Sequence, residues 1–198
     1  MRIFVYIKST ENIAMFERTI QLFYRKEVEV FVSTEERRTF RELNNIKREC
    51  TEDDIVMIGT VKSLGISTVD VANQLQWFID KPVMLVICDV NTTYTFGVSQ
   101  PLNKAVLGTI LQSVLENDGR VVRVSGNRRN NSGRSKVEFP EGWEELFGQW
   151  ENKEISSGEF LEKSGLKKAT FYNLISEYKK MKEISEGLSE KYKRRESV

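Results

Sequence analysis

Short strand-like runs alternate with helix-like segments along the first half of the chain, and this alternation constrains the fold more than any other feature. Apolar and β-branched residues dominate the strand-like runs, which are Ile3–Ile7, Val28–Val32, Ile55–Ile58 and Val83–Ile87. Apolar residues recur at helical spacing in the segments between them, which are Asn12–Tyr24, Phe40–Ile46 and Thr68–Phe78. This order predicts an α/β fold, in which helices flank a mostly parallel sheet.

The segment Asn103–Leu115 has a strong apolar stripe, and no strand-like run follows it. The stripe consists of Val106, Leu107, Ile110, Leu111 and Val114. Such a helix either completes the core of the α/β domain or, because it stands at the end of the domain, forms a dimer interface. Both interpretations stay open, and the second predicts a homodimer or a tetramer.

Several classes of site are excluded by residues that the chain lacks. It has no histidine and only two cysteines, Cys50 and Cys88. Zinc sites built on histidine and histidine-dependent nucleophilic catalysis are therefore ruled out, and no glycine-rich phosphate-binding motif is present. We expect neither metal nor cofactor. The longest apolar run, Val83–Cys88, is too short to cross a bilayer, and we find no signal peptide, so we expect a cytoplasmic protein that does not bind membranes.

Positive charge is concentrated in the second part of the chain. Residues 1–117 carry 13 Lys and Arg against 15 Asp and Glu, whereas residues 118–198 carry 17 against 14. Residues 119–136 contain six basic residues and no acidic one, among many Gly, Asn and Ser. This composition predicts an extended linker that contacts a polyanion, although a solvated basic loop would look the same. The residues suited to an A·T-rich minor groove are Arg128, Arg129, Arg134 and Lys136.

A pattern of three short helices follows Pro140. Ser156 and Glu159 have the spacing of a capping box at the start of the second helix, with Ser157 as an alternative cap. Gly165 suits a left-handed turn, and a basic helix begins just after it. This pattern predicts a helix-turn-helix that binds double-stranded DNA, with a three-helix module for protein contacts as the alternative.

The first turn of the third helix supplies the candidate recognition residues. Ala169 and the methyl group of Thr170 suit contact with thymine methyls, and Asn173 suits pairing with adenine. The residues suited to phosphate contacts are Lys167, Lys168 and Tyr172. We therefore expect an α/β domain at 1–117 that ends in a dimerisation helix, a basic linker or arm at 118–139, a helix-turn-helix domain at 140–182 and a basic tail at 183–198.

Four short motifs, in this order along the chain, resemble the small serine recombinases, the resolvases and invertases. The opening Met1–Thr10 resembles their Gly-Tyr-x-Arg-Val-Ser-Thr motif, and Leu64-Gly65-x-Ser67 resembles Asp-Arg-Leu-Gly-Arg-Ser. Gly133–Lys136 resembles the Gly-Arg-Pro-Lys linker, and Lys168–Tyr172 resembles the Arg-Ser-Thr-x-Tyr of the recognition helix. The resemblance implies a resolvase-like α/β domain, a DNA-binding domain, and a serine that links covalently to DNA.

The chain departs from this family at the catalytic positions. The nucleophilic serine falls on Thr10, although a slip of one residue places Ser9 there, and the first arginine becomes Lys8. Ser63 and Ile66 stand where the second motif has arginines, and Lys62 replaces its aspartate. A further active-site arginine is matched by Arg37 or Arg38.

These departures favour a protein that no longer cleaves DNA. Lysine cannot reproduce the bidentate contacts of arginine with a phosphate, and each lost donor costs about 100- to 1,000-fold in rate. We therefore expect a bacterial, nucleoid-associated DNA-binding protein that acts as a transcriptional regulator or as an architectural or accessory factor. The alternative is an active recombinase that uses Ser9 or Thr10 together with Lys8, Arg37 and Arg38.

Overall fold

The computed structural model describes residues 1–23, 28–36, 39–95, 98–124 and 137–192, with side chains from 117 to 124 left undescribed. The chain divides into two compact units. The first unit comprises Met1–Gly126 together with Met181–Val198, and the second comprises Asn127–Lys180. Each unit has its own apolar core.

Four parallel strands form the sheet of the first unit, as the sequence predicts. They are β1 (Arg2–Lys8), β2 (Glu29–Glu35), β3 (Ile55–Ile58) and β4 (Met84–Ile87), in the order β2-β1-β3-β4. Val5 of β1 lies opposite Val32 of β2 and Met57 of β3. The strand order reverses between β1 and β3, and in open α/β sheets such a reversal marks the crevice where ligands bind.

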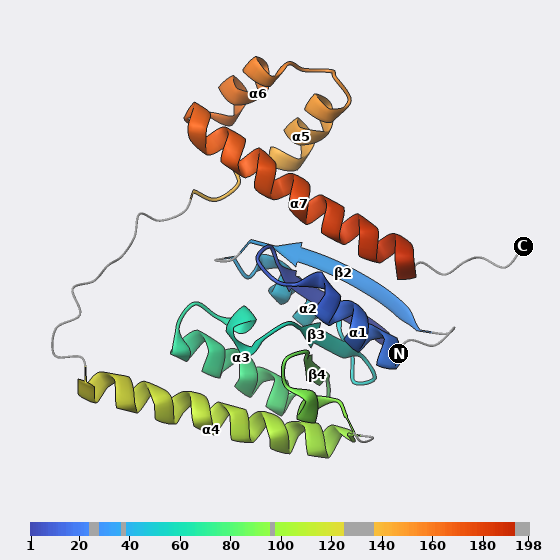
Figure 1. The fold of residues 1–198 in the computed structure, drawn as a ribbon, viewed down its shortest axis with the longest axis vertical. Coiled ribbons are helices and arrows are strands. Elements are labelled where there is room, and N and C mark those ends of the chain that lie inside the picture. Colours follow the sequence, from blue (N-terminus) through green and yellow to red (C-terminus); the bar gives the residue numbers. More distant parts are fainter. Residues whose placement is uncertain (24–27, 37–38, 96–97, 125–136, 193–198) are drawn as a thin grey trace, which may run out of the picture. The chain divides into compact units, whose positions relative to one another are not determined.

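Helices cover both faces of this sheet (Figure 1). They are α1 (Ile13–Phe23), α2 (Arg41–Glu49), α3 (Thr68–Asp80) and α4 (Gln100–Val124), with short 3₁₀ turns at Val61–Leu64 and Asn91–Thr93. Leu43 of α2, Leu75 of α3 and Leu107 of α4 share one buried cluster with the side chains on one face of the sheet. Phe16 and Ile20 of α1 belong to the cluster on the opposite face.

The apolar stripe of α4 packs onto the core of its own unit. Leu107 is fully buried, and Val106 is half-buried. The remaining stripe residues, which pack against the same core cluster, are Ile110, Leu111 and Val114. The helix is also longer than the sequence pattern predicts, because it continues to Val124. Leu115 lies outside the buried stripe, with 54% of its surface exposed.

Three helical segments surround the aromatic core of the second unit. They are α5 (Trp143–Glu151), α6 (Ser157–Ser164) and the beginning of α7 (Lys168–Tyr192). Ser156 and Glu159 form the predicted capping box, with hydrogen bonds of 2.7 and 3.2 Å between each side chain and the backbone N–H of the other residue. Gly165 adopts the predicted left-handed conformation, with a φ of 65°.

The second half of α7 belongs to the first unit. Residues 183–192, which the sequence analysis assigned to a basic tail, continue this helix to Tyr192. Leu188 and Tyr192 are buried in the cluster that also contains Phe16 and Ile20, and Ile184 packs against that cluster. Apolar residues spaced four apart lie on one side of a helix, so this segment completes the covering of the sheet. Residues 193–198 lie outside the described residues.

Candidate functional site

Lys8, the candidate for the family's first arginine, is the last residue of β1 and is almost fully buried. Its ammonium group donates hydrogen bonds to the backbone carbonyls of Glu36, at 2.9 Å, and Thr39. It also lies 3.8 Å from the carboxylate of Glu35, which accepts a 2.7 Å hydrogen bond from the hydroxyl of Tyr6. Lys8 therefore ties the end of β1 to the segment after β2.

The surroundings of Lys8 disfavour its charged form. Burial lowers the pKa of Lys8 to about 8, although Glu35 acts in the opposite direction. Burial and the neighbouring Glu35 carboxylate raise the pKa of Tyr6 far above its ordinary value. The ammonium group also lies 4.1 Å from the ring centre of Phe40. A buried cation with these partners is not placed to receive a DNA phosphate.

A carboxylate that the sequence analysis did not identify lies at the crevice between β1 and β3. Glu11 accepts hydrogen bonds from the Ser63 hydroxyl, at 2.5 Å, and from the backbone N–H of Lys8, at 2.8 Å. Burial raises the pKa of Glu11. Glu11 also packs closely against Gly59, where an added Cβ would lie 2.2 Å from a carboxylate oxygen of Glu11. This arrangement places an acidic side chain beside the end of β1 and the turn after β3.

The two candidate nucleophiles lie in the turn after β1. Ser9 is half-buried, and its backbone N–H donates to the carbonyl of Glu35 at 2.9 Å. Thr10 is exposed. The structure thus brings Lys8, Ser9 and Thr10 to the same edge of the sheet, whereas Arg37 and Arg38 lie outside the described residues.

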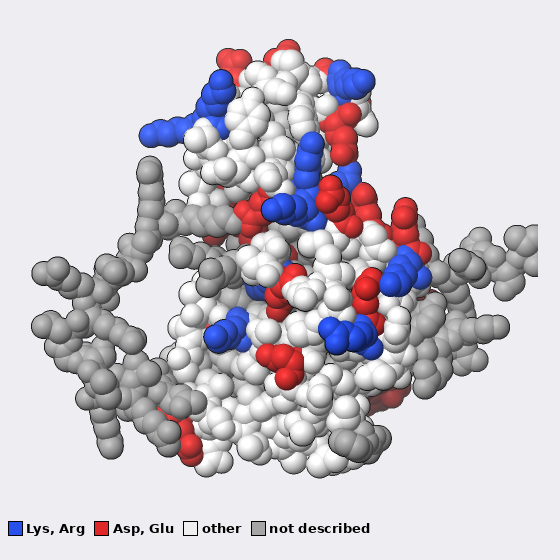
Figure 2. All heavy atoms as spheres, in the orientation of Figure 1, with Lys and Arg blue, Asp and Glu red and all other residues white. Residues whose placement is uncertain are grey.

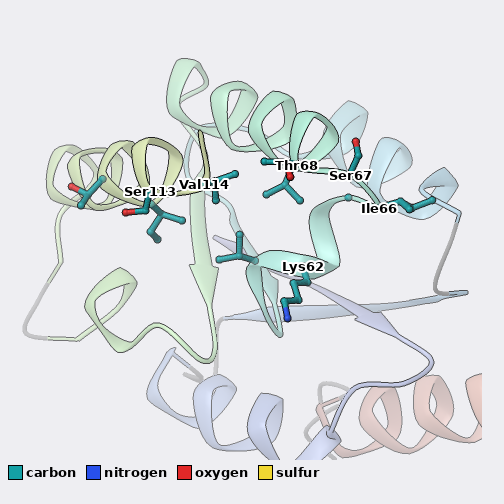
Figure 3. A pocket seen from close by; sticks show the side chains of 11 residues that line it. Lys62, Ile66, Ser67, Thr68, Ser113 and Val114 are labelled. Carbon is teal, nitrogen blue, oxygen red and sulfur yellow. The ribbon is translucent and has the colours of Figure 1, made fainter. Parts of the chain in front are cut away.

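A pocket of about 770 Å³ lies between α4 and the segment from Val61 to Val71 (Figure 3). Ser113 and Val114 line it from α4, and Ser67 and Thr68 line it from the start of α3. Its wall combines aliphatic side chains and hydroxyl groups with the ammonium group of Lys62. Ile66, which the motif comparison aligned with an arginine, also lines the pocket, and 63% of its surface is exposed.

The candidate recognition residues of α7 share one exposed side of the helix. Lys168, Ala169, Tyr172 and Asn173 are exposed, and Thr170 is half-buried. Phe171, Leu174 and Ile175 lie on the opposite side, buried against α5 and α6 in the aromatic core. Lys167 is exposed immediately before the helix begins.

Positive charge within the described part of the second unit is limited. Residues 137–180 carry six Lys and nine Glu, a net charge of −3. Among the described residues on the face shown in Figure 2, basic and acidic side chains are interspersed. The largest run of basic residues without an acidic one is therefore in 119–136, before the described part of this unit. Four candidate contact residues in that segment lie outside the described residues, namely Arg128, Arg129, Arg134 and Lys136.

The described residues give no sign of a metal site or a membrane segment. They contain no cluster of three or more acidic or cysteine side chains suited to a metal ion. No helix among them is both long enough and apolar enough to cross a membrane. No model of a known protein family matches the chain, and no curated protein matches its sequence.

Proposed function

We propose that this protein is a sequence-specific DNA-binding protein built on a serine recombinase-like scaffold that has lost strand cleavage. Its role is that of a transcriptional regulator or of an architectural or accessory factor on DNA. The observation that carries the proposal is the exposed side of α7, where Lys168, Ala169, Tyr172 and Asn173 lie together on the first turns of the helix.

The local geometry supports a helix-turn-helix. α6 ends at Ser164, Gly165 turns the chain in a left-handed conformation, and α7 begins at Lys168. The side of α7 that holds Phe171 and Leu174 packs into the core, so the opposite side is free to enter a major groove. Asn173 suits a bidentate contact with adenine, and Lys168 suits a phosphate.

The surroundings of Lys8 support the loss of cleavage. Phosphodiester attack needs preorganised donors around the developing negative charge. Lys8 instead donates to two backbone carbonyls and lies near Glu35. Glu11 adds a carboxylate at the same edge of the sheet, bonded to Ser63 at the position of a catalytic arginine. These features disfavour an anionic substrate at this crevice.

We also propose that the protein forms a homodimer through the surface around the α4 pocket. The stripe first considered for this role contributes to the core of its own unit, with Leu107 fully buried. Three exposed apolar residues belong to the elements that wall the pocket, namely Ile66 (63%) in the turn before α3, Val69 (61%) in α3 and Leu115 (54%) in α4. Exposed large apolar side chains on neighbouring elements are typical of a protein interface.

The test of DNA binding begins with selection of a duplex from a random library by the full-length protein, followed by titration in a gel-shift assay. Asn173→Ala should weaken binding to the selected site by about 5- to 150-fold, the worth of one bidentate base contact. Asn152→Ala, at an exposed asparagine of the same unit, should bind as the wild type does. Failure to enrich any duplex, or equal affinities for the two variants, would overturn the proposal.

The loss of cleavage is tested on supercoiled DNA that carries the selected site. After incubation, the sample is denatured with detergent and examined for protein linked to DNA. We expect binding without a covalent adduct. An adduct that disappears in Ser9→Ala or Thr10→Ala would identify an active serine recombinase instead.

A further inference from the structure

The outer edge of β2 is where the described sheet ends, because β2 is the first strand in the order β2-β1-β3-β4. Ser9 of the turn after β1 donates to the carbonyl of Glu35, so the odd-numbered residues of β2 bond toward β1. Backbone groups alternate in direction along a strand, and those of Val30, Val32 and Thr34 therefore point outward. An edge of this kind can pair with another strand unless something covers it.

The second half of α7 covers this edge (Figure 1). The Thr34 hydroxyl donates to the carbonyl of Met181 at 3.3 Å, and the Ser185 hydroxyl donates to the carbonyl of Val32 at 3.5 Å. Further along the helix and the strand, Ser189 and Val30 line one groove together. Four residues rise about 6 Å along a helix and two residues about 6.6 Å along a strand. Every fourth residue of α7 therefore lies beside every second residue of β2.

A small number of side chains hold this segment in place. Leu188 and Tyr192 are 2% and 6% exposed in the core cluster of the first unit, and Ile184 packs against that cluster. At the exposed end of the segment, Lys191 forms a 2.8 Å ion pair with Glu17 of α1. Exposed pairs of this kind contribute little to stability, so the apolar residues carry most of the attachment.

The strand beneath this segment has the composition of a pairing strand. Val30–Thr34 is uncharged and rich in β-branched and aromatic residues. Phe31 is 45% exposed and stacks on Phe4 with a ring-centre distance of 5.4 Å. A groove of about 440 Å³ runs beside it, between β2 and α2. Identical strands that meet across a twofold axis pair antiparallel, which satisfies the outward backbone groups of both.

We propose that Met181–Tyr192 is a strap that shields the edge of β2, and that a chain with a released strap pairs through β2 with the β2 of a second copy. This association involves a surface different from the α4 pocket. It needs neither DNA nor the dimer proposed above. The strap thus prevents sheet-to-sheet association by covering the outward edge of β2, where the Ser185 hydroxyl caps the carbonyl of Val32.

The test compares Leu188→Asp, which should release the strap, with Gly187→Asp, which places the same charge at the neighbouring exposed position. Sedimentation velocity over a concentration series should show mass increasing to twice the wild-type value or more for Leu188→Asp only. Hydrogen exchange measured by mass spectrometry should show protection of residues 29–35 that grows with concentration. Adding Phe31→Lys should return the released chain to the wild-type mass, because a charged edge strand resists pairing.

The milder Leu188→Ala, which buries no charge, provides a second route to release. Exchange of the β1 peptide reports whether the sheet itself remains folded in each variant. A folded Leu188 variant that sediments as the wild type does would overturn the proposal. So would self-association that persists with Phe31→Lys. Loss of β1 protection in both variants would also overturn it, because the segment would then be an inseparable part of the core.

Discussion

The hydroxyl of Ser63 donates a hydrogen bond to the carboxylate of Glu11, 52 residues earlier in the chain. This bond joins the turn after β1 to the turn after β3, at the point where the strand order reverses. Thr60 also contributes, because its backbone N–H donates to the Ser63 hydroxyl at 3.2 Å. The crevice that would serve as a ligand site in a parallel sheet is therefore closed by an internal polar network.

Removal of the Ser63 hydroxyl should destabilise the first unit. Ser63→Ala leaves a partly buried carboxylate with one donor fewer, and we expect the free energy of unfolding to fall by about 1–3 kcal/mol. Ser113→Ala, at an exposed serine of α4, should change it by less than about 0.5 kcal/mol. Urea denaturation followed by circular dichroism measures both. Equal stabilities for the two variants would show that the Glu11–Ser63 bond contributes nothing.

Because Lys8 is buried, the free energy of unfolding should increase as the pH rises above about 8. Its pKa is about 8 in the folded protein, against 10.5 for an ordinary lysine. Between these values the unfolded chain binds the extra proton, so the free energy of unfolding contributed by Lys8 rises with pH, by at most about 1.4 kcal/mol per unit. Below pH 8 both states are protonated and the contribution is constant.

Lys8→Met isolates this effect from that of Lys104, whose pKa burial also lowers to about 8. The variant leaves Glu35 with donors from Tyr6 and from the backbone of Arg41, so we expect it to fold. Stability curves at pH 7 to 10.5 should show a wild-type advantage that grows above pH 8. A difference that stays flat across this window would contradict the burial of the charged amine.

Gly165 should be sensitive to substitution because its φ of 65° lies in the left-handed region. Gly165→Ala should destabilise the second unit by about 1–2 kcal/mol. Gly148→Ala, inside α5 with nothing near the added Cβ, should stabilise it by up to about 1 kcal/mol. Thermal unfolding measures both, and effects of the same sign would argue against a turn between α6 and α7 at Gly165.

The lysines before and at the start of α7 should contribute to the salt dependence of DNA binding. Lys167 and Lys168 are both exposed beside the candidate recognition residues. If each lysine neutralises one phosphate, the double alanine variant should reduce the magnitude of the slope of the logarithm of the DNA association constant against the logarithm of the salt concentration by about 1.8. Lys153→Ala together with Lys163→Ala removes the same charge elsewhere in the unit and should leave the slope nearly unchanged. Equal slopes for the two double variants would remove the phosphate role of Lys167 and Lys168.

Local periodicity was sufficient to predict the parallel α/β sheet and the capped helix α6, since both depend on residues close together in sequence. The network around Lys8 depends on tertiary structure instead. The parallel register places Lys8 directly opposite Glu35, a pairing that no local pattern contains. Motif comparison assigned Lys8 to a catalytic position, whereas its burial follows from packing under Phe40 and beside Tyr6.

The end of α7 shows a second limit of local analysis. Ile184, Leu188 and Tyr192 stand at helical spacing, but charged residues surround them and suggested a basic tail. The explanation is tertiary: α1 alone leaves part of one face of the sheet uncovered, and the apolar residues of this segment bury that part beside α1. The Glu11–Ser63 pair was missed for a similar reason, because two polar residues far apart in sequence give no periodic signal.

The proposed dimer surface should be sensitive to charge on the elements that wall the α4 pocket. Leu115→Asp and Ile66→Asp each place a carboxylate on an exposed apolar position, so neither should unfold the protein. Both should weaken self-association, because an unpaired charge buried in an interface costs several kcal/mol. Leu22→Asp on α1, a leucine with 56% of its surface exposed, is the matched control and should self-associate as the wild type does.

Sedimentation equilibrium gives the dimer dissociation constants, and unchanged values for Leu115→Asp and Ile66→Asp would place any dimer interface elsewhere. Because the β2 strap lies on a different surface, Phe31→Lys should leave these constants unchanged, which separates the two modes of association.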